Sequence, residues 1–246
     1  MKGIIHFHSQ YSYDSMLRVS KIARLLVKND LAFAILTDHN TIKGSLSLRD
    51  YIKKKNLDII APIAAEYQTE YGDVIAAFIK EEIKERSFLS FIKRVRDQNG
   101  LLFLPHPYFN HKQTDFIAEN VDFIEVFNSR KDQDRNLRAI NLARKYNKQI
   151  FFGPDAHSEK ALMNAIISID RNENDKKIST ISNDSELKTL LLESDLKCVK
   201  LKNSKTIDIV SSQYVKSFKT KNPKLFFNLT ISVVNSILRR FILQIR

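Results

Sequence analysis

The sequence predicts an α/β protein in which buried strands are covered by helices, and it favours closure of the strands into a barrel. Short, almost continuously apolar runs alternate along the chain with segments whose apolar residues keep helical spacing. This alternation is typical of parallel strands joined by helices. About seven such units fit within roughly 200 residues, which favours a barrel over an open sheet. No glycine-rich phosphate loop follows the first strand, so a dinucleotide-binding fold is disfavoured.

The expected elements follow from apolar periodicity and from turn residues. The first strand, at 3–8, is rich in isoleucine and phenylalanine, and its alternation places His6 and His8 on one face. The helix at 87–98 ends at Asn99-Gly100, a typical stop signal. Further strands are expected at 32–37, 57–63, 74–78, 101–104, 121–127, 149–152, 164–169 and 198–201. Further helices are expected at 19–27, 41–54, 133–147 and 185–193.

Composition limits the class of protein. The chain has 246 residues, of which 43% are hydrophobic, enough for one large domain or two small ones. Cys198 is the single cysteine, which excludes a disulfide framework and a cysteine-based zinc site. We expect it to be a small core residue. A reducing cytoplasm suits this composition, and the N-terminus lacks the apolar region of a signal peptide.

The positive charge is concentrated at the C-terminus. Eleven Lys or Arg and one acid, Asp208, lie between Lys197 and Arg246, which gives +10 of the net +12 and leaves +2 for residues 1–196. The sequence therefore predicts a barrel over 1–202 and a basic helical extension over 203–246. The nearly neutral body argues against a stable nucleic-acid partner, since phosphate contacts need clustered Lys and Arg.

The extension ends in a helix that is broadly apolar. A polar stripe at helical spacing is formed by Asn228, Ser232, Asn235 and Arg239. The helix is too short and too interrupted to span a bilayer. It is expected either to pack its apolar side on the barrel or to lie on anionic lipid at the inner membrane face. In the second case it would be helped by Lys216, Lys219, Lys221 and Lys224.

Histidines and carboxylates recur where predicted strands end. The histidines at such places are His6, His8, His39, His106 and His157, and the carboxylates are Asp14, Asp38, Glu66 and Asp155. In β/α barrels the C-terminal strand ends meet at one mouth, where the chemistry takes place. The sequence therefore predicts a metal site. A set of His, Asp and Glu without thiolates suits Zn, Mn or Fe and leaves the metal open.

Two neighbouring divalent ions clamp a phosphate and generate hydroxide near neutral pH. A carboxylate such as Glu66 can bridge two ions. The predicted chemistry is therefore hydrolysis of a phosphoester.

The ordered motifs resemble those of the PHP superfamily, named for polymerase and histidinol phosphatase. The resemblance covers residues 1 to about 170. The stretch from Ile124 to Asn128, with Gly153 to Ser158, is similar to the C-terminal segment of that family. The motifs are His6-Phe7-His8, Thr37-Asp38-His39, Glu66, His106-Pro107 and Asp155-Ala156-His157. The resemblance implies a distorted seven-stranded β/α barrel, two or three divalent ions and metal-dependent phosphoesterase activity.

The resemblance also implies roles for single residues. One ion would be held by His6, His8, Glu66 and Asp155, and another by Asp14, His39 and His157. Glu66 would bridge to an ion that His106 also holds. Asp38 would orient His39 or a water molecule. Asp38, Glu66 and His157 are expected to take part in the reaction.

Some positions depart from the family pattern. Ile4 stands where family members often have Asp, and Pro154 precedes Asp155 where they prefer a small hydroxyl residue. The strand after Glu66 contains no histidine, where many members carry one. The number of ions therefore stays open between two and three.

We expect the following of four other residues. Arg130 is expected to bind substrate phosphate, because a guanidinium suits phosphate bidentately. Asn40 either caps the following helix or contacts substrate. Arg18 is expected at the surface, and His111 in a loop.

The predicted substrate is a phosphorylated small molecule or nucleotide. The alternatives are an exonuclease on short oligonucleotides, or a degenerate barrel that serves as a binding or scaffold module.

Overall fold

The described strands form two sheets that meet in the centre of the molecule. The computed structural model describes residues 1–169 and 181–244, with side chains in the last helix as far as Ser236. One sheet has the order β2-β1-β8-β9 and the other the order β3-β4-β5-β6-β7. The strands are β1 (Lys2–Ile5), β2 (Phe33–Ile35), β3 (Ala64–Thr69), β4 (Gly72–Ala77), β5 (Leu101–Leu104), β6 (Phe123–Asn128), β7 (Gln149–Gly153), β8 (Ala165–Ile169) and β9 (Leu196–Leu201).

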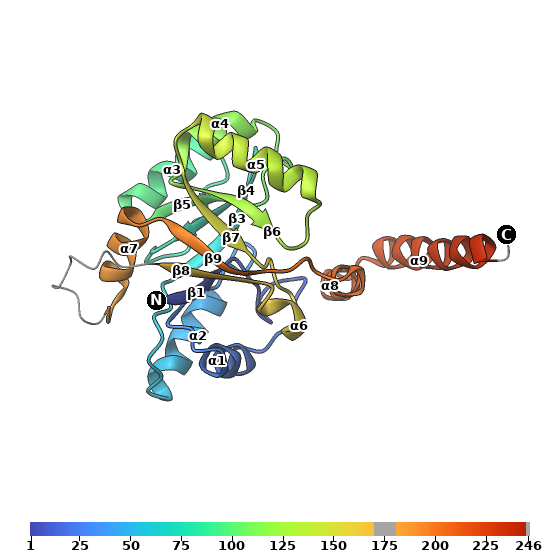
Figure 1. Cartoon of the computed structure of the whole chain (residues 1–246), viewed down its shortest axis with the longest axis horizontal. Coiled ribbons are helices and arrows are strands. Elements are labelled where there is room, and N and C mark those ends of the chain that lie inside the picture. Colours follow the sequence, from blue (N-terminus) through green and yellow to red (C-terminus); the bar gives the residue numbers. More distant parts are fainter. Residues whose placement is uncertain (170–180, 245–246) are drawn as a thin grey trace.

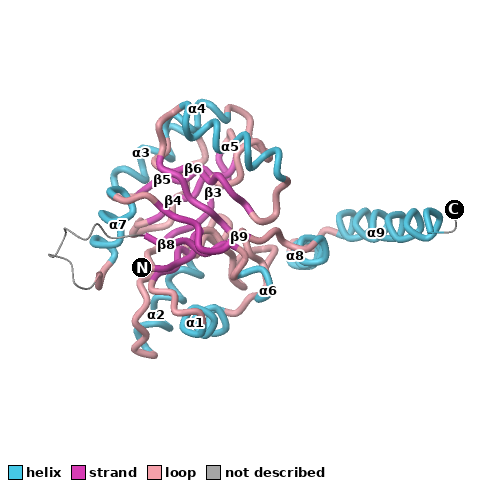
Figure 2. The backbone as a smooth tube through the Cα atoms, in the orientation of Figure 1, coloured by secondary structure: helices cyan, strands magenta, loops and turns pink. Residues whose placement is uncertain are grey.

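Helices surround the strands (Figures 1 and 2). In Figure 1, α1 and α2 lie on one side of the strands, α3, α4 and α5 lie on the other, and α9 projects away from the body. The helices are α1 (Val19–Lys28), α2 (Lys43–Lys54), α3 (Phe88–Asp97), α4 (Thr114–Asn120), α5 (Gln133–Lys145), α6 (Glu159–Leu162), α7 (Asp184–Glu193), α8 (Thr206–Lys219) and α9 (Pro223–Gln244).

Isolated bridges connect the two sheets. Phe33 pairs with Ile60 and His39 pairs with Glu66 near β2 and β3, while Phe7 pairs with Ala156 beyond β1 and β7. Helices and strands alternate along the described chain, so the mixed α/β class is confirmed. The expected single closed sheet of seven strands is not seen as one continuous hydrogen-bonded ladder among the described residues.

The expectation of parallel strands throughout is wrong. The pairs β1–β2, β5–β6 and β6–β7 are parallel, whereas β4 is antiparallel to both β3 and β5. Thr69 pairs directly with Gly72 across a tight turn. So short a connection leaves no room for the crossover that parallel neighbours need. The expected strand at 57–63 is also displaced, because the structure has strand β3 at Ala64–Thr69. Glu66 therefore lies inside a strand and not after one.

Two expectations for the C-terminal region are also corrected. Cys198 is exposed, since it lies on β9 at the edge of its sheet, so it is not a core residue. Over the residues that the structure describes, helix α9 projects from the body and contacts α8, where the Tyr214 hydroxyl lies 3.2 Å from Thr230 Oγ1. The side chain of Arg239 lies outside the described residues. No helix in the described part of the chain has the length and apolarity needed to cross a bilayer.

Apolar packing holds the strand ends in place. Helix α1 buries Val19, Ile22, Ala23 and Leu26, at the helical spacing that the sequence predicts. Every residue of β2 and of β5 is buried, as expected for strands covered on both faces. The loops that follow these strands therefore start from fixed positions.

Gly44, in the first turn of α2, provides a test of this packing. A Cβ at this position would lie 1.7 Å from Asp38 Oδ2 and 2.7 Å from Ser9 Oγ. Glycine to alanine in an open helix is stabilising by about 1 kcal/mol. Here we expect Gly44→Ala to destabilise the protein by about 1–3 kcal/mol, because the buried carboxylate must move. Thermal unfolding measures the change. Asp50→Ala, on the exposed side of α2, is the control, and a Gly44→Ala variant as stable as the wild type would contradict the contact.

Candidate metal centre

The eight predicted metal ligands come together where strands of both sheets end. His6 and His8 follow β1, His39 follows β2, and His106 follows β5. Asp155 and His157 follow β7, Asp14 lies in the loop before α1, and Glu66 lies within β3. The structure thus gathers His6, His8, Asp14, His39, Glu66, His106, Asp155 and His157, although their roles as ligands stay predictions.

One group of ligand atoms forms around the two N-terminal histidines. His6 Nε2 and His8 Nε2 lie 3.5 and 3.4 Å from Glu66 Oε2. The same nitrogens lie 3.8 and 3.5 Å from Asp155 Oδ1. Two imidazole nitrogens and two carboxylate oxygens therefore face a common point.

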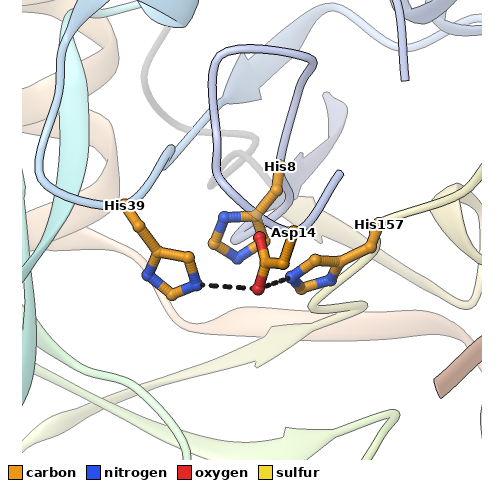
Figure 3. Close-up of side chains that lie close together, drawn as sticks. All are labelled: His8, Asp14, His39 and His157. Atoms are coloured by element: carbon orange, nitrogen blue, oxygen red, sulfur yellow. Dashed lines mark ion pairs between the residues drawn. The ribbon is translucent and has the colours of Figure 1, made fainter. Parts of the chain in front are cut away.

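A second group forms around Asp14. Its Oδ2 lies 3.3 Å from His39 Nε2 and 3.0 Å from His157 Nε2, so that the two rings approach the carboxylate from opposite sides (Figure 3). The ring of His8 stacks beside both, with centroid distances of 4.5 and 4.2 Å. Since His39 Nδ1 also lies 3.3 Å from Glu66 Oε2, the two groups share Glu66 as a neighbour.

The second oxygen of Glu66 faces a third histidine. His106 Nε2 lies 3.0 Å from Glu66 Oε1, and together with His6 they form a further set of closely spaced ligand atoms. Both oxygens of Glu66 are thus directed at imidazoles from different loops. This arrangement suits a bridging carboxylate.

The convergence of His6 and His8 does not come from strand alternation, so that expectation is wrong. Strand β1 ends at Ile5, and His6 has a positive φ of 74°. His106 and Asp155 also have positive φ values, 30° and 44°. Such backbone is rare outside glycine and is typical of functional sites, where surrounding structure maintains the strain. Backbone kinks after β1, β5 and β7 therefore direct these three side chains towards the site.

Several buried atoms of the site lack hydrogen-bond partners. They are His6 Nε2, His8 Nδ1, His8 Nε2, Glu66 Oε2 and His106 Nδ1. Buried polar atoms are almost always paired, so unpaired ones need an explanation. Divalent cations would satisfy the converging nitrogens and oxygens, and this donor set suits Zn, Mn or Fe. The residues present therefore fit divalent ions.

Burial and opposite charge affect the histidines differently. Burial, with His157 and His39 nearby, lowers the pKa of His8 to about 3. Burial also opposes the charge of His39, but Glu66 and Asp14 raise its pKa to about 9. Burial disfavours ionised Glu66, yet His39 and His6 hold its pKa well below the usual value. The central carboxylate therefore stays ionised, as a metal ligand must be.

Glu125 supports the site and was not among the predicted site residues. Its Oε1 lies 2.8 Å from His6 Nδ1, and its Oε2 accepts hydrogen bonds from the His106 backbone N–H and from Asn128 Nδ2. Asn128 also donates to Asp155 Oδ2. A carboxylate on Nδ1 leaves His6 Nε2 free for an ion. The available signal was an acid in the otherwise apolar run of β6.

Two predicted residues point elsewhere. Both oxygens of Asp38 accept hydrogen bonds from Ser9, at 2.6 Å each, so Asp38 contacts Ser9 instead of His39. Burial raises the pKa of Asp38 to about 6. Asn40 Oδ1 accepts from the Gln68 backbone N–H and lines a separate shallow groove. Asn40 does not cap α2, which begins without a side-chain cap.

Five of the predicted ligands line a cleft of about 300 Å³, namely Asp14, His39, His106, Asp155 and His157, whereas His6, His8 and Glu66 are fully buried. Arg130 lines it, as predicted, with Nη1 3.6 Å from Asp155 Oδ1 and Nη2 donating to Ser212 Oγ at 2.8 Å. Lys131 and Lys216 also line the cleft, each over an aromatic ring. The acidic and imidazole base therefore has a basic rim. Arg18 is exposed beside a different cavity.

His111 is closer to the site than a loop position implied. It is largely buried, and its Nε2 donates to the backbone carbonyl of Asp73 at 2.8 Å. Its ring centroid lies 5.6 Å from that of His106, and burial lowers its pKa to about 4. Asp73 lines the cleft, in the strand that lacks the family histidine.

Comparisons with known proteins agree with this geometry. The PHP domain family model matches residues 5–219. The uncharacterized protein MJ0417 of Methanocaldococcus jannaschii is 32% identical over 179 residues, which cover 68% of this chain and 70% of that protein.

Two solved structures share the fold. One is a two-domain protein from Bacteroides vulgatus, described as containing a predicted PHP-like metal-dependent phosphoesterase. It has a TM-score of 0.64 and 16% identity over 82% of this chain, and the chain covers 65% of its length. The other, from Bifidobacterium adolescentis, is described as a candidate metal-dependent phosphoesterase, with a TM-score of 0.53 and 12% identity over 77% of this chain and 95% of that one.

The fold and the clustered ligands thus define an α/β protein with a candidate multinuclear metal centre. The chain belongs to the PHP domain family, which confirms the resemblance seen in the sequence.

Metal binding at the Asp14 group should depend on pH. In the metal-free protein His39, with its pKa raised to about 9, carries a proton at neutral pH. An ion must displace that proton, so affinity should rise by about tenfold per pH unit from about pH 7 towards about pH 9. Calorimetry in buffers of different protonation enthalpy counts the protons released.

The control for this titration is His111→Gln. Because the pKa of His111 is about 4, its removal should not change the proton count at neutral pH. Affinity that stays constant over this pH range would contradict the predicted displacement.

Proposed function

We propose that the protein is a metal-dependent phosphoesterase that hydrolyses a phosphomonoester or nucleotide-type substrate by attack of an activated water. One observation carries the proposal: buried, unpaired atoms of His6, His8 and Glu66 face each other within 3.4–3.5 Å. Their neighbours Asp14, His39, Asp155 and His157 line a cleft that has a basic rim. This combination favours binding of ions at the base and of an anion above them.

Divalent ions held there would supply a hydroxide near neutral pH and would offset charge on the phosphoryl group. The chain's own residues would bind and orient the substrate. Arg130, beside Asp155, presents a guanidinium suited to phosphate oxygens. Lys131 and Lys216 add positive charge at the rim. Glu66 would hold neighbouring ions together through its two oxygens.

The size of the cleft favours a small substrate. A volume of about 300 Å³ lies at the lower end of ligand pockets. A phosphorylated small molecule or a nucleotide fits this volume better than a long nucleic acid. An exonuclease that removes single nucleotides from short oligonucleotides is the main alternative, because only the terminal nucleotide would then enter the cleft.

Phosphate release tests the proposal directly. Purified protein with Mn²⁺ should release phosphate from members of a phosphomonoester and nucleotide panel, and His8→Ala should reduce the rate by at least about 10²-fold. The substitution removes an imidazole common to both main ligand groups. Cys198→Ser, on the exposed edge strand, is the matched control and should keep full activity.

Each other result of this assay has a definite meaning. Activity that survives both His8→Ala and chelation would exclude the mechanism. Cleavage of end-labelled short oligonucleotides without release from monoesters would identify the exonuclease alternative. Protein that binds no metal in stoichiometric analysis would instead indicate a binding or scaffold module.

We also propose that α9 binds an anionic membrane surface, such as the inner face of the cytoplasmic membrane. Phe227, Ile231 and Val234 are 63, 59 and 47% exposed on a helix that projects from the body. No Asp or Glu follows Asp208 in the sequence, and apart from Lys216 and Lys219, which contact the body, five Lys or Arg do. Exposed apolar side chains among unopposed positive charges are typical of helices that lie in a lipid interface.

Vesicle co-sedimentation tests this attachment. The full chain should sediment with phosphatidylglycerol-containing vesicles and much less with phosphatidylcholine vesicles, since basic residues each add about 1 kcal/mol at an anionic surface. A chain that ends after Lys221 should stay in the supernatant. Asn228→Ala, on the polar stripe, is the control for the helix itself. Equal sedimentation of the shortened chain would contradict the proposal.

A further inference from the structure

Lys219, in the last turn of α8, reaches across to a loop near the other end of the chain. Its Nζ donates hydrogen bonds to the backbone carbonyls of Gln10, Ser12 and Ser15, each at 2.7 Å. An ammonium group has three donors, so all of them are used. This contact joins residues more than 200 positions apart.

The loop that Lys219 holds carries Asp14. Within it, Ser12 Oγ donates to Asp14 Oδ1 at 2.8 Å, which orients the carboxylate. Ser15 Oγ lies within hydrogen-bond distance of the carbonyls of His8 and His157, at 3.1 and 3.2 Å. The path of this loop therefore decides where Asp14 meets His39 and His157.

The loop has little regular structure of its own. It lies between β1 and α1, outside both. Its own backbone bonds run from Gln10 to Leu17 and from Ser12 to Ser9. The carbonyls of Ser12 and Ser15 are bonded in partly buried contacts, and such carbonyls are costly to leave unpaired, so a donor is needed where they converge. Hydrogen bonds from a charged donor are stronger than neutral ones.

Helix α8 is itself seated beside the metal ligands. Ser212 accepts a hydrogen bond from Arg130, and Asp208 accepts one from Ser158 at 3.4 Å. Lys216 lies over the ring of Tyr13, which stacks on His39 with a centroid distance of 4.6 Å. The helix is thus fixed at several points along its length, and Lys219 extends from a defined position.

We propose that Lys219 is a positioning residue for the metal centre: it holds the 10–15 loop so that Asp14 meets His39 and His157. This inference rests on the proposed metal-dependent function. It makes α8 part of the site, and it predicts that replacing Lys219 affects the binding of the two ions unequally. The ion at Asp14, His39 and His157 depends on Lys219, whereas the ion at His6, His8, Glu66 and Asp155 does not.

Metal titration of full-length variants tests the inference. Lys219→Met keeps the apolar stem and removes the donors, Lys219→Arg restores donors, and Lys224→Met makes the same change at an exposed position on α9. Co²⁺ binding followed by visible absorption, with calorimetry, reports each ion separately. We expect Lys219→Met to weaken one ion by about tenfold or more and to leave the other within about twofold. Lys219→Arg should recover part of the loss, and Lys224→Met should match the wild type.

Hydrogen exchange gives a readout that does not need a bound ion. In metal-free Lys219→Met, the amides of residues 10–17 should exchange about tenfold faster, while those of β5 should not change. Unchanged exchange and affinity would overturn the inference. Equal weakening of both ions with a lower Tm would also overturn it, because it would indicate only a general stabilising role. If the wild type binds metal but releases no phosphate, the proposed function fails while a selective loss at one ion still supports Lys219.

Discussion

The ionised, buried carboxylate of Glu66 is the constraint on which the site depends. Its Oε2 lies within 3.5 Å of nitrogens from His6, His8 and His39, and its side chain has no exposed surface. A buried charge is tolerated only with partners of opposite or polar character. The fold must therefore bring loops from both sheets to β3. The isolated backbone bridge between His39 and Glu66 joins one of these loops to β3.

Further hydrogen bonds hold the imidazoles in the orientation in which they face this carboxylate. Glu125, in β6, bonds His6 on the side away from the cluster and also bonds the His106 backbone. Gly153 faces it so closely that a Cβ would lie 1.9 Å from Glu125 Oε1. Such contacts orient ligands before an ion arrives, which reduces the reorganisation that binding requires. The positive φ values of His6, His106 and Asp155 are maintained by this surrounding structure.

The C-terminal region has two distinct parts. Helix α8 lies against the cleft and contributes Lys216 to its rim, and the family match extends to its last residue. Helix α9 projects beyond it with exposed apolar side chains. From composition alone, α8 and α9 form one basic tail, because a count of charges does not distinguish a lysine bonded to carbonyls from one in water. The domain boundary expected at 202 stays a prediction, but the contacts of α8 connect it closely to the body.

The sequence by itself determined the α/β class, most helices and strands, and the identity of the residues that gather at the centre. These follow from apolar periodicity and from histidines and acids at strand ends, which are local signals. Only the tertiary structure decided that β4 runs antiparallel, that His6 is aimed by a kink, and that Glu125 and Lys219 belong to the site. Asp38 and Asn40 turn to Ser9 and Gln68 for the same reason. Their partners are chosen by packing between distant segments, and no short-range pattern records which loop a side chain will meet.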